Sequence, residues 1–194
     1  MEKTAVQRLA AVLRTMVLIV FVLNLLCLLF VPGMAVICLD RDTMADPEWR
    51  KALVWTLQER GLLFVGVVCL GGFRSLLEHA PVGVLSLFFW VCGTCTALIL
   101  WQARSVLDTI LGGNPFQLKN ARALNRAAVC CWIISGVALL RLLWWLWHDH
   151  SAAPFFTYNA LFIPAFLMAG LLFQVMSALF RQAAELKEDQ DLTI

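Results

Sequence analysis

The sequence predicts an all-α fold, an integral-membrane four-helix bundle with a short amphipathic or interfacial external segment. Hydrophobic residues make up 61% of the 194 residues, and charged residues only 14%. The apolar residues come in long runs instead of the mixed pattern of a water-soluble core. Because a helix needs roughly 20 apolar residues to cross a bilayer, runs of this length predict membrane spans. We expect a single membrane domain over residues 1–194.

Four segments are long enough to span. Residues 15–39, 80–103 and 151–180 contain no Lys, Arg, Asp or Glu, and residues 127–147 are interrupted only by Arg141. With the helix signals described below, the spans are predicted at about 15–39, 80–111, 115–147 and 155–182, with an external segment at 40–79 and a tail at 183–194. The first run is too long for a cleavable signal peptide, so we expect it to remain in the protein.

The second and third spans are predicted to continue beyond the bilayer as a helical hairpin. Gly112 and Gly113 indicate the end of one helix, since glycine readily ends a helix in the left-handed conformation. Asn114 and Pro115 then suit the cap and the first position of the next helix. Within this hairpin, Asp108 is placed to pair with Arg104 on the same helical face.

The external segment leaves one alternative open. Residues 61–73 are uncharged but too short, as a helix, to cross about 30 Å of hydrocarbon. We interpret them as interfacial or packed on the bundle. If residues 61–79 entered the membrane as a fifth span, the carboxyl terminus would lie outside.

Basic residues predict the orientation, because short cytoplasmic loops carry an excess of Lys and Arg. They precede the first span, lie between the second and third spans, and follow the fourth. An even number of spans brings all three groups to one side of the membrane. The sequence therefore predicts that both termini are cytoplasmic.

Two oppositely charged surfaces are predicted on the cytoplasmic side as candidate partner-binding residues. The basic face of the third helix consists of Lys119, Arg122 and Arg126, and the acidic tail contains Glu185, Glu188, Asp189 and Asp191. The basic face has two interpretations. It lies among anionic lipid headgroups, or it pairs with the acidic tail.

Polar side chains inside the spans form a second candidate set. Arg141 is the charged member, and the amides are Asn24, Gln102, Asn159 and Gln174. A charge at such depth often marks function, but a long arginine near the outer end of its helix also reaches the interface. Amides between helices more often supply packing hydrogen bonds than a transport path.

No catalytic or metal-binding pattern is found in the sequence. Cys92 and Cys95 form a CxxC pair within an apolar helix, where cysteine acts as a small packing residue. His148 and His150 flank an aspartate, yet positions two apart on a helix do not converge on one metal ion. No nucleotide, hydrolase or metalloprotease motif occurs. We expect no enzymatic activity, no cofactor and no metal.

Two segments carry a family resemblance. These are Gly113-Asn114-Pro115-Phe116 with Asn120-Ala121-Arg122-Ala123-Leu124, and the ending Glu185-Leu186-Lys187-Glu188-Asp189-Gln190-Asp191-Leu192-Thr193-Ile194. Together they resemble the YoaS-like family of small bacterial membrane proteins, a domain family of unknown function. The resemblance covers residues 80–194 and implies a four-span protein of the bacterial cytoplasmic membrane, commonly encoded beside a helix-turn-helix regulator.

Two functions follow as hypotheses. The first is a non-enzymatic regulatory membrane protein that holds a cytoplasmic partner, such as that helix-turn-helix regulator, at the lipid bilayer. This hypothesis involves no direct binding of nucleic acid by the chain itself. The alternative is a small transporter or channel subunit that acts as a homo-oligomer, with Arg141 and the intramembrane amides along a path.

Overall fold

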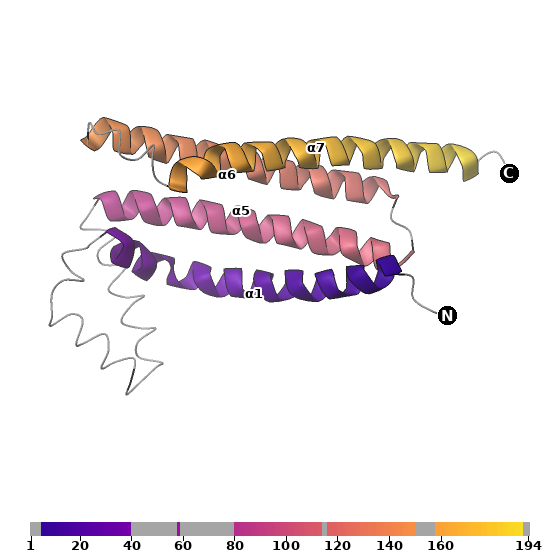
Figure 1. Cartoon of the computed structure of the whole chain (residues 1–194), viewed down its shortest axis with the longest axis horizontal. Coiled ribbons are helices and arrows are strands. Elements are labelled where there is room, and N and C mark those ends of the chain that lie inside the picture. Colours follow the sequence, from indigo (N-terminus) through magenta and orange to yellow (C-terminus); the bar gives the residue numbers. More distant parts are fainter. Residues whose placement is uncertain (1–4, 40–57, 59–79, 114–115, 150–157, 192–194) are drawn as a thin grey trace. The chain divides into compact units, whose positions relative to one another are not determined.

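The protein is an all-α four-helix bundle, as predicted. The computed structural model describes residues 5–39, 58, 80–113, 116–149 and 158–191. Its long helices are α1 (Ala5–Leu39), α5 (Ala80–Leu111), α6 (Leu118–Asp149) and α7 (Tyr158–Asp191) (Figure 1). Each is long and apolar enough to cross a membrane. Apart from residue 58, the predicted external segment at 40–79 lies outside the described residues, and so does the question of whether 61–79 enters the membrane.

The turn between α5 and α6 contains the predicted glycine stop. Gly113 has a φ of 79°, in the left-handed region that glycine adopts without steric cost. The Gly112 amide still donates to the Asp108 carbonyl, which completes the last turn of α5. α6 begins at Leu118, later than the predicted start at 115, and the Gln117 carbonyl accepts its first hydrogen bond, from Asn120, at 2.9 Å. The predicted cap, Asn114 and Pro115, lies outside the described residues.

α7 is longer than the predicted fourth span. It runs without interruption to Asp191, so residues 183–191 of the predicted tail continue the helix. Ala, Glu, Leu, Lys and Gln dominate this stretch, and all are strong helix formers. The acidic residues are therefore presented on a helix.

α6 and α7 form an antiparallel pair with a regular seam. Three pairs of positions mark it, and they step by seven residues in opposite directions along the two helices: Ser135 with Ile163, Ala128 with Gly170, and Ala121 with Ser177. At the two ends a serine hydroxyl donates to a carbonyl oxygen of the facing helix, at 2.9 Å and 2.7 Å. A seven-residue spacing is typical of left-handed coiled-coil packing, and small side chains let the backbones approach closely.

Phenylalanines form a second seven-residue series on α7, each three residues after one of the seam positions Ile163, Gly170 and Ser177. Phe166, Phe173 and Phe180 also recur every seven residues, and all three are half-buried. The Phe180 ring lies 5.8 Å from that of Phe116, measured between ring centroids. Phenylalanines thus alternate along α7 with the seam positions Ile163, Gly170 and Ser177.

α1 and α5 take part in two compact units, residues 1–24 with 94–194, and residues 25–93. In the first unit the centroids of the Phe21 and Trp101 rings lie 6.0 Å apart. In the second unit a Cβ atom added at Gly93 would lie only 2.6 Å from the Leu28 side chain, so the helices approach closely there. Ala35 and Leu85 form a small buried core in the second unit.

The helix surfaces suit an apolar surrounding. Few residues in the apolar stretch of α7 are buried, and large side chains such as Leu161, Met168 and Leu172 are exposed. A water-soluble protein rarely exposes apolar patches of this extent. The four apolar helices are consistent with a multi-pass membrane protein.

Candidate functional site: the charged end of the helices

The first unit gathers the charged helix ends at one place. The guanidinium Nε of Arg14, in the amino-terminal part of α1, lies 2.8 Å from a carboxylate oxygen of Asp108 near the end of α5. Asp108 therefore binds an arginine of another helix, not Arg104 of its own helix as predicted. Since α5 ends where α6 begins, this contact brings the start of α1 to the α5–α6 turn.

A buried side-chain amide stabilises the same turn. The Asn120 side chain is fully buried, and its Nδ2 donates to the Thr109 hydroxyl at 2.6 Å. The Thr109 hydroxyl in turn donates to the Val106 carbonyl at 2.7 Å. Asn120 begins the second stretch of the first segment that carries the family resemblance. In this structure it joins the end of α5 to the start of α6.

α7 brings its carboxyl-terminal half to this end as well. The Ser177 hydroxyl donates to the carbonyl of Ala121, one turn above the start of α6. The predicted grouping of the three basic segments is thus present: the start of α1, the α5–α6 turn and the last turns of α7 lie together in the first unit. The cytoplasmic orientation of this end stays a prediction.

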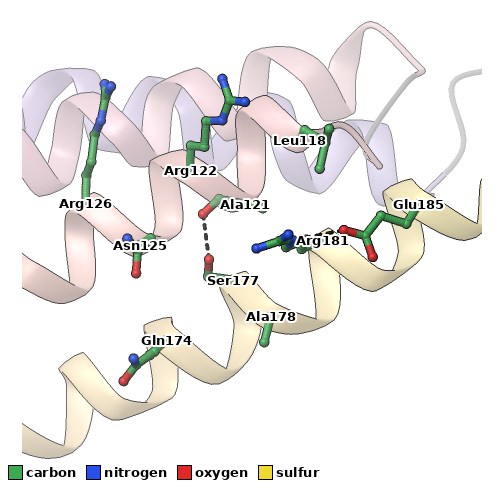
Figure 2. Close-up of a pocket in the computed structure, with 10 residues that line it drawn as sticks. All are labelled: Leu118, Ala121, Arg122, Asn125, Arg126, Gln174, Ser177, Ala178, Arg181 and Glu185. Atoms are coloured by element: carbon green, nitrogen blue, oxygen red, sulfur yellow. Dashed lines mark hydrogen bonds and ion pairs between the residues drawn. The ribbon is translucent and has the colours of Figure 1, made fainter. Parts of the chain in front are cut away.

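A cavity opens between α6 and α7 at this charged end. Its volume is about 620 Å³. It is lined mainly by polar and basic residues: Leu118, Ala121, Arg122, Asn125 and Arg126 from α6, and Gln174, Ser177, Ala178, Arg181 and Glu185 from α7 (Figure 2). Three arginines and one glutamate are among the lining residues, so the lining carries a net positive charge.

The structure places the predicted basic face partly in this cavity. Arg122 and Arg126 are exposed, come from successive turns of α6 and extend to the same side (Figure 2). Lys119 is exposed but does not line the cavity. Two of the three predicted basic residues thus share a site.

Of the predicted acidic tail, too, only some of the residues line the cavity. Glu185 lines the cavity, where its carboxylate accepts a hydrogen bond from Arg181 Nε at 2.9 Å. Among the described residues, Glu185 thus pairs with an arginine of its own helix rather than with the basic face. Glu188 and Asp189 are exposed farther along α7. Asp191 ends the helix, and its side chain lies outside the described residues.

The predicted intramembrane polar residues do not gather in this site as a set. Gln174 is exposed and lines the cavity. Arg141, Asn24 and Gln102 are half-buried in other parts of the helices, and the Asn24 side-chain oxygen is buried without a hydrogen-bond partner among the described residues. The Asn159 side chain lies outside the described residues.

No group of three His, Cys, Asp or Glu side chains within residues 5–39, 80–113, 116–149 and 158–191 is placed to hold a metal ion. The side chains of His148 and His150 lie outside the described residues.

Sequence reasoning missed three polar residues of the cavity. These are Asn125 of α6 and Ser177 and Arg181 of α7. They come together only because the helix faces that carry them pack against each other. The seven-residue repeat of small residues on α7, Gly170–Ser177–Ala184, was a detectable signal for that pairing. It indicates which face of α7 meets α6, and hence which polar residues flank the seam.

Comparisons with known proteins identify a family but no characterised relative. No curated protein and no solved structure is significantly similar to the chain. A family model described as "Protein of unknown function (DUF2975)" matches residues 2–194. This agrees with the resemblance to a domain family of unknown function, although the YoaS-like name itself is not tested by the match. The chain belongs to the DUF2975 family.

Proposed function

We propose that this protein is a non-enzymatic, multi-pass protein of the bacterial cytoplasmic membrane that holds a soluble partner at its charged end. In this proposal both termini are cytoplasmic, because the basic groups at the charged end obey the positive-inside rule only in that orientation. The partner class that fits best is a helix-turn-helix transcription regulator.

The observation that carries the proposal is the helical extension of α7. The last apolar stretch ends at Phe180, yet the helix continues to Asp191 and presents exposed carboxylates at Glu188 and Asp189. A rigid acidic helix beyond the membrane complements a basic surface on another protein. Charge complementarity of this kind fixes the choice of partner and speeds association.

A DNA-binding surface is such a basic surface, since it neutralises backbone phosphates with Lys and Arg. A regulator bound to the acidic helix would be kept from DNA. The family resemblance supports this partner class because it implies that such a regulator is encoded nearby.

The chemistry of the charged end supports binding rather than catalysis. The cavity offers guanidinium and amide groups, which bind anions. The hydroxyl of Ser177 donates to the Ala121 carbonyl, and no base accepts its proton. A nucleophile needs such a base to be activated.

The test uses the purified full-length protein in nanodiscs and the helix-turn-helix protein that the family resemblance implies is encoded beside its gene, also purified. Binding is measured by biolayer interferometry. We expect saturable binding that weakens at least about tenfold in E188Q/D189N, since two charge-assisted contacts are removed. The control Gln190→Ala changes the same turn without removing charge and should bind as the wild type does. Absence of binding, or equal binding by E188Q/D189N, would contradict the proposal.

A further inference from the structure

We propose that the cavity between α6 and α7 binds the phosphate headgroup of an anionic phospholipid. Its lining includes Arg122, Arg126 and Asn125 from α6 and Gln174 and Arg181 from α7, and in Figure 2 the Arg122 and Arg126 side chains extend together to one side of α6. This site is distinct from the exposed carboxylates of α7 that are proposed to hold a partner.

The charge of the lining selects an anion. The lining contains three arginines but one carboxylate, that of Glu185, which is already paired with the Nε atom of Arg181. A guanidinium group has five N–H donors, so Arg181 keeps donors for a second ligand. Arginine forks match the geometry of phosphate oxygens and bind them through paired, charge-assisted hydrogen bonds. The amide groups of Asn125 and Gln174 add neutral donors.

The depth of the cavity matches that of lipid headgroups. Arg126 is the last charged residue of α6 before a stretch of uncharged residues that reaches Leu140. On α7, Arg181 is the first charged residue after the uncharged stretch that ends at Phe180. The cavity therefore lies where both helices pass from hydrocarbon to water, which is where lipid phosphates reside. Basic pockets between helices at this level are typical sites for anionic lipid headgroups.

Apolar stripes lead from the cavity toward the membrane centre. On α6, Val129 and Ile133 follow the lining residues on the same side of the helix, and both are exposed. On α7, Leu171 and Leu167 continue the side that carries Gln174, and both are exposed as well. These side chains provide a surface for acyl chains below the headgroup. A free phosphate ion would gain nothing from them, so the stripes favour a phospholipid as the source of the phosphate.

The test measures lipid retention by the full-length protein. The protein is purified in mild detergent, supplied with equal amounts of phosphatidylglycerol and phosphatidylcholine, and analysed by native mass spectrometry. We expect the wild type to retain phosphatidylglycerol preferentially. In R122Q/R126Q and in R181Q this preference should fall by at least about fivefold per charge removed, the factor that corresponds to the attraction of one basic residue for an anionic surface.

A matched control separates the site from general surface charge. R8Q/K187Q also removes two positive charges from exposed residues of the first unit, but neither residue lines the cavity. Its preference for phosphatidylglycerol should equal that of the wild type. Thermal melting of each variant in detergent confirms that it is folded, and R181Q supplies an independent test if R122Q/R126Q fails to fold.

Three outcomes would overturn the proposal. The first is equal retention of both lipids by the wild type. The second is an equal loss of preference in R8Q/K187Q and R122Q/R126Q, which would indicate unspecific attraction. In a separate arm, inorganic phosphate is titrated against the lipid-loaded protein. Complete displacement of the lipid at millimolar phosphate would assign the site to a soluble anion, which is the third contradicting outcome.

Discussion

Gly170 of α7 lies directly against the indole ring of Trp132 on α6. A Cβ atom at this position would collide with the ring and lie 3.3 Å from the carbonyl oxygen of Ala128. The contact lies midway along the seam, between the hydrogen bonds that Ser135 and Ser177 make at its two ends. Close approach of α6 and α7 thus depends on the absence of a side chain at residue 170.

A bulky side chain at this position should therefore weaken the α6–α7 pair. We expect Gly170→Leu to destabilise the detergent-solubilised protein by about 1–3 kcal/mol, the usual cost of overpacking a close contact. Thermal melting followed by tryptophan fluorescence measures the effect, and Trp132 also reports the local change. Gly136 provides the control, because a Cβ atom there meets nothing within 4 Å. Melting of Gly170→Leu at the temperature of Gly136→Ala would contradict the packing described here.

The sequence was sufficient for the fold class but not for the pairing of helix faces. Charge-free runs predicted the four helices, and Gly112 and Gly113 predicted the end of α5, because these signals are local. The partner of Asp108 was not predictable in the same way. Arg104 is near it along the helix, whereas Arg14 is far away in sequence and comes close only through the packing of α1 on α5.

The candidate site was predicted in part for the same reason. Arg122 and Arg126 stood out as a basic stripe on one helix, and the structure places both at the cavity. The sequence identifies Arg181 only as a basic residue that directly follows the charge-free run at 151–180. Its role depends on the rotation of α7, which is set by the small residues Gly170 and Ser177 at the seam.

The ion pair between Arg14 and Asp108 should couple α1 to α5 weakly. Both side chains are nearly half exposed, at 46% and 44%, so water and salt screen the interaction. In a double-mutant cycle of R14Q and D108N we expect a coupling free energy of up to about 1 kcal/mol at low salt, decreasing as salt is added. Melting temperatures of the four proteins provide the cycle. A coupling found for R104Q with D108N, and absent for R14Q with D108N, would show that Asp108 pairs along its own helix instead.

Removal of the Thr109 hydroxyl should be more costly than removal of another threonine hydroxyl. In Thr109→Val the buried amide of Asn120 loses the acceptor that lies 2.6 Å away. An unsatisfied buried donor costs about 1–3 kcal/mol, and we expect a loss of stability in that range. Thr15 is the matched control, since its exposed hydroxyl binds only the Ala11 carbonyl of its own helix. Chemical denaturation in mixed micelles measures both variants; equal stabilities of T109V and T15V would show that the contact contributes nothing.

The partner-binding proposal depends on the charged end of the helices facing the cytoplasm. The most direct test is cysteine labelling in cells with a membrane-impermeant maleimide, on a background in which all seven native cysteines are replaced. Gln190→Cys reports the exposed end of α7, and Trp147→Cys reports the opposite end of α6, where the side chain is 85% exposed. We predict that Trp147→Cys is labelled in spheroplasts, whereas Gln190→Cys is labelled only after the membrane is permeabilised. Labelling of Gln190→Cys in intact spheroplasts would contradict the account.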